Sequence, residues 1–369
     1  ARKLGDIVKK VGAKKVMVFH GPNVKAAGLV DPCLKSLEEA GVPYVVYDKV
    51  EIESPMHSIE ESAALGRSEG VDTCVAIGGG SCMDTAKVAR MLITNPGTCR
   101  DYTTNIGTEL YPNKGAHLIC IPTTSGTGSE VTFTAVMHDV ENQRKISTRD
   151  REKLVPDYAL LDPEMTKDLP PYFTAITGMD AIAHACEALC CTRSNIYTEM
   201  ICGKSLELSW KNLPIVYKEP HNMEARANMS LAAYLALTGE SYGNCGHSMA
   251  HAIGADFHVP HGHCCAWIAP VALYYTRNDC DHEIRLIARS FGLDDKSPTV
   301  AKDVANAMKQ LVWSLGIKTP AEMGIKREDF IASAPKVMVD PIHLCCHTPL
   351  TEDKARELLG EVYDQKLYE

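Results

Sequence analysis

The first half of the chain alternates uninterrupted apolar runs with amphipathic stretches. The apolar runs predict strands at 15–20, 44–50, 73–80 and 116–122, and the intervening pattern predicts helices at about 24–40, 57–69 and 82–94. Short buried strands that alternate with helices are typical of a parallel sheet covered on both faces. We therefore expect this half to be an α/β domain with a Rossmann-like parallel sheet.

The pattern changes near residue 162. From there to the end, apolar residues recur at helical spacing among many alanines and leucines, which predicts an all-helical domain. A chain of 369 residues is also longer than one ordinary hydrophobic core supports. We predict two domains, an α/β domain over 1–162 and a helical domain over 163–369.

Charge and composition narrow the function classes. The formal net charge is −9, which disfavours a nucleic-acid partner. The sequence shows neither a membrane-spanning run nor a signal-peptide pattern, so we expect a cytoplasmic protein that does not bind membranes. The 15 cysteines lack zinc-ribbon spacing, and we interpret them as reduced thiols packed as small apolar groups.

Two polar loops follow predicted strands. In the first, IGGGSCMDTAK (77–87), three glycines lead directly into a helix, whose free N–H groups suit a pyrophosphate. Alone, this is equally a tight turn that binds nothing. The second loop, IPTTSGTGSE (121–130), is rich in hydroxyl groups and glycine. Two such loops at the carboxyl ends of parallel strands flank one crevice, which favours a nucleotide site.

Acidic and histidine side chains recur at helical spacing in the second half. GMDAIAHACE (178–187) places Asp180 and His184 on one helix face, and GHSMAHAIGADFHVPHGHCC (246–265) places His247 and His251 likewise. Five histidines lie between 247 and 263. A buried cluster of imidazoles is costly without a partner, and a divalent cation supplies one. Nitrogen and oxygen donors suit Fe²⁺, Zn²⁺, Mn²⁺, Co²⁺ or Ni²⁺.

Spacing alone leaves the ligand set open. His258, His263 and the nearby cysteines compete with the other histidines for the ion. Cys264 and Cys265 either face this site or pack in the core, and we favour the core.

The two polar loops (77–87 and 121–130) and the two histidine segments (178–187 and 246–265) occur in an order that resembles the iron-containing (group III) alcohol dehydrogenases. This family includes lactaldehyde:propanediol oxidoreductase and the butanol and 4-hydroxybutyrate dehydrogenases. The resemblance implies an N-terminal dinucleotide-binding domain and a C-terminal helical domain. It also implies NAD(P)-linked oxidation of a small alcohol or reduction of an aldehyde, with Fe²⁺ as the metal or Zn²⁺ instead. A homodimer or larger homo-oligomer is expected.

The resemblance also assigns residues to these roles. The metal ligands would be Asp180, His184, His247 and His261, and His251 would relay a proton to solvent. The cofactor would contact the following positions: Gly78, Gly79, Gly80, Ser81, Asp84, Thr123, Thr124, Thr127, Thr132 and Lys145.

Three departures from the family pattern matter. The family usually opens with a β-hairpin that this sequence lacks, so we expect a truncated chain. Gly21 stands where NAD-preferring members often carry an aspartate, which leaves NAD and NADP both open. The segment LCCHTPLTED (344–353) replaces the usual C-terminal motif beside the substrate, so the substrate cannot be transferred from a relative.

The expected mechanism uses the metal as a Lewis acid on the substrate oxygen while the cofactor exchanges hydride. Three alternatives stay open on sequence alone. The first is a zinc-dependent relative of glycerol dehydrogenase or dehydroquinate synthase, the second is a metallohydrolase, and the third is a non-catalytic metal-binding protein.

Overall fold

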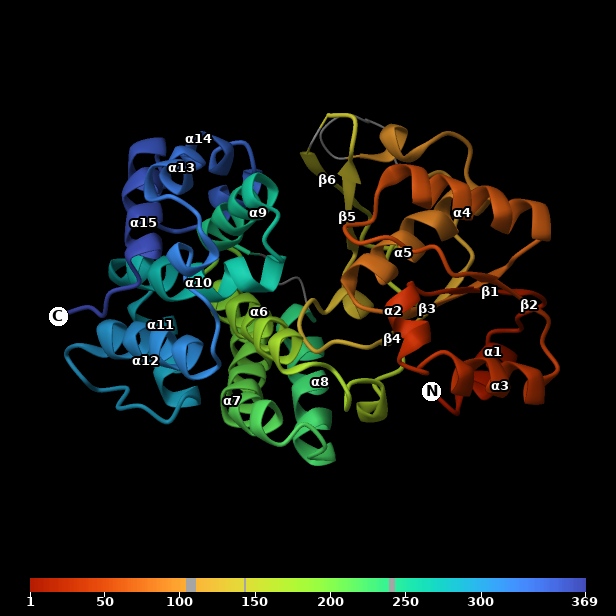
Figure 1. The fold of residues 1–369 in the computed structure, drawn as a ribbon, viewed down its shortest axis with the longest axis horizontal. Helices are drawn as coiled ribbons and strands as arrows, with labels where there is room; N and C mark the ends of the chain where they lie inside the picture. The colour runs from red at the N-terminus through yellow and green to blue at the C-terminus, as the bar shows by residue number, and fades with distance from the viewer. Residues whose placement is uncertain (104–110, 143, 239–242) are drawn as a thin grey trace. The chain divides into compact units, whose positions relative to one another are not determined.

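Five short strands form a parallel sheet in the order β2-β1-β3-β4-β7 (Figure 1). Their bounds are β1 (Val16–Phe19), β2 (Tyr44–Tyr47), β3 (Thr73–Gly78), β4 (His117–Pro122) and β7 (Tyr158–Ala159). The computed structural model describes residues 1–103, 111–142, 144–238 and 243–369. Strands β3 and β4 are neighbours in register from Thr73 opposite His117 to Gly78 opposite Pro122, so the loops that follow them leave the same edge of the sheet.

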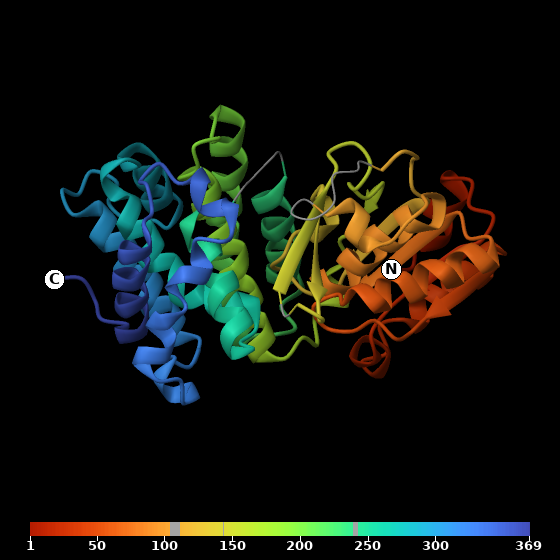
Figure 2. The ribbon, with the colours of Figure 1, turned by 90° about the horizontal axis from the view of Figure 1, so that it is seen from above.

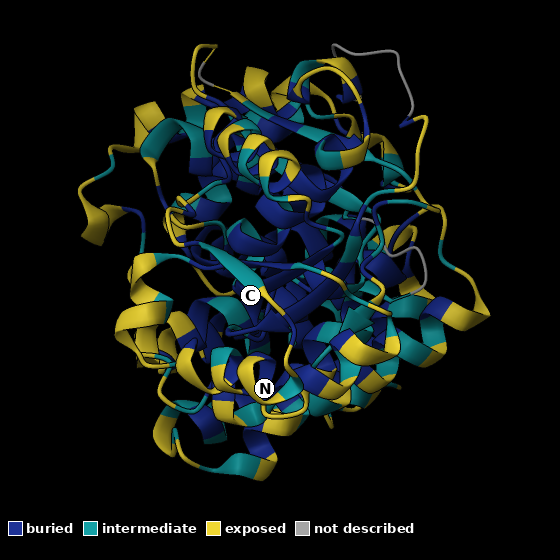
Figure 3. Cartoon of the chain, turned by 90° about the vertical axis from the view of Figure 1, so that its right-hand side faces the viewer, coloured by how far each residue is buried: buried dark blue, intermediate teal, exposed yellow. Residues whose placement is uncertain are grey.

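Alternating strand residues pack against different helices. Met17 and Phe19 of β1 belong to a core with α4 and α5, whereas Val16 and Val18 belong to a separate core with α1 and α3. Both faces of the sheet are therefore covered, which explains why the strands read as continuous apolar runs. These helices are α1 (Leu4–Lys10), α2 (Pro22–Ala26), α3 (Asp31–Ala40), α4 (Met56–Glu69) and α5 (Gly80–Thr94). The central strands β1, β3 and β4 are almost entirely buried, and Figure 3 shows the buried interior dark blue and the outer helix turns yellow.

Two features of this unit differ from the sequence prediction. The helix expected over 24–40 is two helices, α2 and α3, because Gly28 adopts a left-handed φ of 72° between them. An antiparallel pair, β5 (Thr134–Asp139) and β6 (Arg144–Arg149), was not predicted. Its strands alternate buried and partly exposed residues rather than forming an apolar run.

The second unit is helical. Its helices are α6 (Pro171–Leu189), α7 (Ile196–Lys218), α8 (Met223–Leu237), α9 (Cys245–Phe257), α10 (His261–Tyr275), α11 (Asp281–Ser290), α12 (Val300–Ser314), α13 (Arg327–Ala332), α14 (Ala334–Val337) and α15 (Glu352–Asp364). Asparagines cap three of them: Asn195 at α7, Asn222 at α8 and Asn244 at α9. One hydrophobic core runs through the unit, whose helices Figure 2 shows in green to blue, and most residues of α6 and α10 are buried in it.

Short 3₁₀ turns complete the chain. They are η1 (Cys99–Tyr102), η2 (Ser129–Val131), η3 (Pro163–Met165), η4 (Thr276–Asn278), η5 (Ala321–Met323) and η6 (Pro341–Cys345). The α/β unit comprises 1–124 and 129–168, and the helical unit comprises 125–128 and 169–369. Among the described residues, none of the helices combines the length and apolar character that a membrane crossing requires.

All 15 cysteines lie in described parts of the chain, and all have free thiols. Fourteen are buried, and Cys345 is half-buried. These largely buried positions, outside any disulfide, agree with thiols packed as small groups, except at Cys265, whose sulfur lies near His247 and His261.

Candidate metal centre and nucleotide loops

Helix α6 presents two of the predicted metal ligands and a further carboxylate. Asp180, His184 and Glu187 are four and three residues apart, so they share one face of the helix. All three sit within an otherwise apolar, buried helix. Ionisable groups in such surroundings are costly unless a partner compensates them, so this face is the natural place to look for a site.

Helices α9 and α10 supply the remaining histidines. His247 and His251 are one turn apart on α9, and His261 is the first residue of α10, directly after Pro260. Gly262 allows α10 to approach α6 closely, because a Cβ at this position would lie 2.4 Å from the backbone oxygen of Ile176. This contact sets the start of α10, and with it His261, against the helix that carries Asp180.

The Asp180 carboxylate lies among three imidazoles. Its Oδ1 atom is 3.5 Å from His184 Nδ1, 3.9 Å from His247 Nε2 and 3.6 Å from His261 Nε2. Donor atoms that share a divalent ion at bond lengths of ~2.0–2.2 Å are roughly 3.0–3.6 Å apart. Asp180 Oδ1 thus lies at or slightly beyond this spacing from one nitrogen of each of the three histidines that the resemblance implies as ligands.

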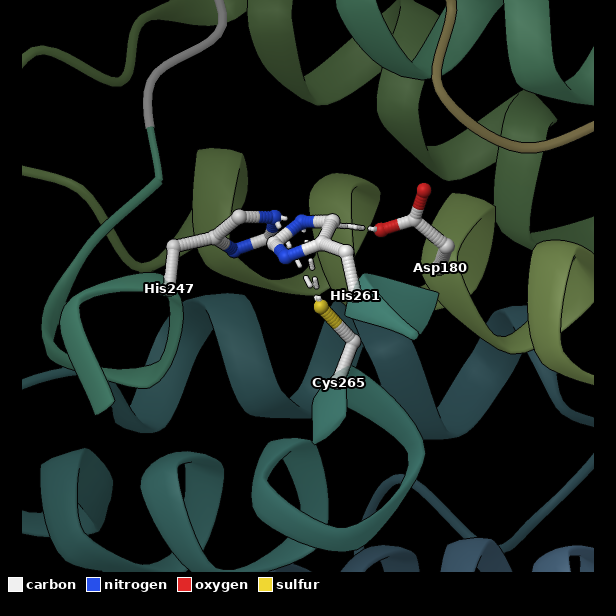
Figure 4. A group of neighbouring side chains, drawn as sticks. All are labelled: Asp180, His247, His261 and Cys265. Carbon is white, nitrogen blue, oxygen red and sulfur yellow. Dashed lines mark hydrogen bonds and ion pairs between the residues drawn. The ribbon is translucent and has the colours of Figure 1, made fainter. Parts of the chain in front are cut away.

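Cys265 also lies at this centre. Its Sγ is 3.5 Å from His261 Nε2 and 4.0 Å from His247 Nε2. Asp180, His247, His261 and Cys265 each offer one donor atom within 4.8 Å of the others (Figure 4). His184 stands beside this group, with its ring centroid 4.3 Å from that of His247.

The other residues that the sequence offered as metal ligands, His258, His263 and Cys264, do not face the Asp180 carboxylate. Both ring nitrogens of His263 are hydrogen-bonded, one to the Tyr172 hydroxyl and one to the Lys318 carbonyl oxygen. His258 is exposed at the end of α9, and the Cys264 thiol donates to the Val259 carbonyl oxygen. Of the cysteine pair, Cys264 packs in the core as expected, whereas Cys265 is buried and faces the imidazoles.

Glu187 orients His247. Its Oε1 accepts a hydrogen bond from His247 Nδ1 at 2.8 Å, and its Oε2 accepts from the backbone N–H groups of Asn244 and His247. Burial lowers the pKa of His247, but the facing Glu187 outweighs burial and raises that pKa to about 9. With Nδ1 committed to Glu187, Nε2 is left to face Asp180 and His261.

The pKa of His184 shifts in the opposite direction to that of His247. Desolvation outweighs the attraction of Asp180 and lowers the pKa of His184 to about 4, so its ring is neutral at neutral pH. In the described part of the chain, neither His184 Nδ1 nor Asp180 Oδ1 has a hydrogen-bond partner. A buried carboxylate oxygen and a buried imidazole nitrogen that both lack a hydrogen-bond partner are donors that a divalent cation can satisfy.

His251 has a separate carboxylate partner. Its Nδ1 lies 2.6 Å from Asp340 Oδ2, and its ring stacks on His261 with centroids 5.1 Å apart. Asp340 itself is fixed because it caps η6 by accepting from the Ile342 N–H. The pair therefore holds an imidazole in a set orientation beside the predicted ligands.

The two polar loops of the α/β unit lie next to each other. The Thr123 N–H donates to the Gly78 carbonyl oxygen, and a Cβ on Gly79 would lie 3.3 Å from Thr124 Oγ1. Gly79 is the N-cap of α5, and no side chain caps that helix. Gly80 and Ser81 therefore open a helix whose N-terminus is suited to an anionic group.

Three of the remaining predicted cofactor residues, Asp84, Thr132 and Lys145, have polar partners within the α/β unit. Asp84 accepts hydrogen bonds from Ser129 Oγ and the Val136 N–H, and burial raises its pKa. Thr132 accepts from the buried Lys87 ammonium. Lys145 pairs with Glu53 at 2.8 Å. Thr127 belongs to the four residues that group with the helical unit.

Sequence reasoning did not single out three of these residues, Glu53, Glu187 and Asp340, and it favoured the core for Cys265, which faces the imidazoles instead. Glu187 was detectable, because it lies on the Asp180 face of the helix seven residues later. The spacing of Cys265, four residues after His261, favoured the site over the core. Asp340 and Glu53 carry no sequence signal, since long-range folding brings each to its partner. Glu53 and Ser54 adopt left-handed φ values of 68° and 51° beside Ser81.

Comparison with known proteins agrees with this architecture. The model of the iron-containing alcohol dehydrogenase family matches residues 1–163, and its C-terminal family model matches 174–363. The chain is 33% identical to choline dehydrogenase of Bacillus subtilis over 344 residues, covering 91% of this chain and 85% of the relative. It is 32% identical to sulfoacetaldehyde reductase of Bilophila wadsworthia over 339 residues, covering 89% and 86%.

A solved structure shares the whole fold. Alcohol dehydrogenase from Oenococcus oeni superposes with a TM-score of 0.93 at 31% identity, covering 98% of this chain and 96% of that one. An α/β unit with paired polar loops and a helical unit with clustered histidines thus define an alcohol dehydrogenase, an oxidoreductase. The chain belongs to the iron-containing alcohol dehydrogenase family. This membership decides against the hydrolase and non-catalytic alternatives.

Proposed function

We propose that the protein is a metal-dependent, NAD(P)-linked dehydrogenase that interconverts a small alcohol and its aldehyde. The observation that carries the proposal is the buried Asp180 Oδ1 atom, which lies 3.5–3.9 Å from three imidazole nitrogens and lacks a hydrogen bond within the described residues. Asp180, His184, His247 and His261 would hold Fe²⁺ or Zn²⁺. When bound, the metal supplies Lewis acidity toward the substrate oxygen.

The protein residues position and move protons around that centre. Glu187 keeps His247 Nδ1 occupied and so directs Nε2 to the ion. Asp340 likewise holds His251 Nδ1, which leaves His251 Nε2 to accept the alcohol proton during oxidation and return it during reduction.

The nicotinamide cofactor would use the two polar loops. Its pyrophosphate would meet Gly78, Gly79, Gly80 and Ser81 at the uncapped start of α5, with Thr123 and Thr124 on the neighbouring loop. Asp84, Thr127, Thr132 and Lys145 complete the proposed set. A relative that covers 92% of this chain, at 29% identity, is the NAD-dependent methanol dehydrogenase of Bacillus methanolicus.

The test is a panel of short alcohols and aldehydes with NAD(H) and NADP(H), after anaerobic loading with Fe²⁺ or Zn²⁺. We expect metal-dependent turnover, followed by the absorbance of the reduced nicotinamide. Asp180→Ala and His261→Ala should lose both the metal and turnover. His251→Ala should keep the metal but slow turnover by roughly 10²–10⁴-fold. Full turnover in metal-free protein would contradict the proposal.

A further inference from the structure

The sulfur of Cys265 lies inside the proposed metal centre rather than in the apolar core around it. It is 3.5 Å from His261 Nε2 and 4.0 Å from His247 Nε2, and it lies within 4.8 Å of an Asp180 carboxylate oxygen (Figure 4). The side chain is 2% exposed, so water does not compete for the sulfur. Donors that share a tetrahedral ion at ~2.0–2.3 Å are roughly 3.3–3.8 Å apart, close to these separations.

The local fold explains why a sulfur occupies this place. Cys265 follows His261 by one turn of α10, so the two side chains share a face. The close approach of α10 to α6 at Gly262 then brings that face to Asp180. The adjacent Cys264 points away from this face and donates to the Val259 carbonyl oxygen.

A second observation shows that this place is built for a cation. Asp180 Oδ1 is almost fully buried and has no hydrogen-bond partner among the described residues, although it points at the same group of atoms. The Cys265 sulfur lies within 4.8 Å of this carboxylate, yet Asp180 Oδ1 is left without a hydrogen bond from any described residue. A divalent ion shared by carboxylate, imidazoles and sulfur satisfies all of them at once.

We propose that Cys265 is a sulfur ligand of the divalent metal, in addition to the proposed ligands Asp180, His184, His247 and His261. The inference rests on the proposed metal-dependent function. When the metal–sulfur bond forms, the thiol proton leaves to water. A thiolate among nitrogen and oxygen donors favours borderline ions such as Zn²⁺ or Co²⁺ over Mn²⁺ and Mg²⁺. The centre would therefore select its metal partly through sulfur.

X-ray absorption of the zinc-loaded wild-type enzyme tests this directly. We expect one sulfur scatterer at about 2.3 Å beside the nitrogen and oxygen shell at about 2.0–2.1 Å. The cobalt-loaded enzyme should show a thiolate-to-cobalt charge-transfer band in the near ultraviolet. Both signals should vanish in Cys265→Ser and persist in the matched control, Cys264→Ser. Zinc affinity should fall by about tenfold or more in Cys265→Ser, with a smaller change for Mn²⁺.

The possible results distinguish a failure of the sulfur ligand from a failure of the proposed metal-dependent function. Bound metal with only nitrogen and oxygen scatterers in the wild type would overturn the sulfur ligand and leave the proposed function intact; Cys265 would then be only an S–H donor to His261. Absence of stoichiometric metal binding by the wild type would overturn both. Signals that persist in Cys265→Ser but vanish in Cys264→Ser would also refute the assignment.

Discussion

Glu187 is proposed to support metal binding indirectly, by holding the His247 imidazole in place. It accepts one hydrogen bond from the imidazole and two from backbone N–H groups, so replacing it with glutamine keeps the shape but removes the negative charge. We expect Glu187→Gln to weaken Zn²⁺ affinity by about 10–100-fold, the usual cost of losing such a partner. Competition with a chromophoric chelator measures this.

A surface carboxylate provides the control for that experiment. Glu207→Gln removes an exposed charge that pairs at 2.8 Å with Lys204 on the surface, and metal affinity should not change. Equal affinities in Glu187→Gln and the wild type would show that Glu187 does not support His247 in this way.

Glu130 is a buried acid of the α/β unit with no part in the metal centre. Burial raises its pKa from 4.5 to about 7, although Lys87 opposes the shift. The folded protein thus holds this proton more tightly than the unfolded chain, and stability falls as pH rises from about 4.5 to 7. The loss corresponds to roughly 3 kcal/mol.

Glu130→Gln should remove that loss, because the amide does not ionise. Urea unfolding at pH 5 and pH 8 measures the difference: the variant should gain stability relative to the wild type at the higher pH and match it more closely at the lower. The same pH dependence in both proteins would show that Glu130 does not ionise across this range in the fold.

At the scale of elements, the approach of α10 to α6 sets the centre. A Cβ on Gly262 would lie 2.4 Å from the Ile176 carbonyl oxygen, which belongs to helix backbone and cannot move alone. Gly262→Ala should push the two helices apart, cost about 1–3 kcal/mol of stability and reduce metal affinity. Thermal unfolding and chelator competition measure the two effects.

Gly203 of α7 is the matched control. The nearest atom to a Cβ there is Ser290 Oγ at 4.0 Å, so alanine fits without displacement. Gly203→Ala should be neutral or stabilise by up to about 1 kcal/mol through helix propensity. If Gly262→Ala behaved in the same way, the close contact would not be what places His261.

Elements with strong periodicity were predictable, and those set by single residues were not. The apolar runs of β1, β3 and β4 lie within one or two residues of their predicted bounds. The break between α2 and α3 depends on the left-handed backbone of Gly28, which a helical pattern conceals. The hairpin β5–β6 escaped notice because its alternation is mixed with charged residues.

The candidate site was likewise predictable where helix periodicity alone places its residues, and not where the tertiary fold does. Ligand candidates spaced four residues apart on one helix were readable, because helix geometry alone brings them together. Asp340 reaches His251 from 89 residues away, and only tertiary folding sets that distance.

At the scale of the whole molecule, metal binding should distinguish the two units. Every proposed metal ligand, and Cys265 with them, belongs to the helical unit, on α6, α9 and α10. A ligand that binds only the folded state stabilises it by about 2.7 kcal/mol at a hundredfold excess over its dissociation constant. The metal should therefore slow hydrogen exchange in these three helices far more than in β1, β3 and β4.

Hydrogen exchange with and without a chelator tests this, with Asp180→Ala as the variant that should not respond. Adding NAD(H) or NADP(H) to the metal-free protein should give the converse pattern, with protection at the start of α5 and in the loop after β4. The two ligands thus act as separate reporters of the two proposed sites. Metal-dependent protection confined to the sheet would place the ion outside the helical unit and contradict the centre built around Asp180.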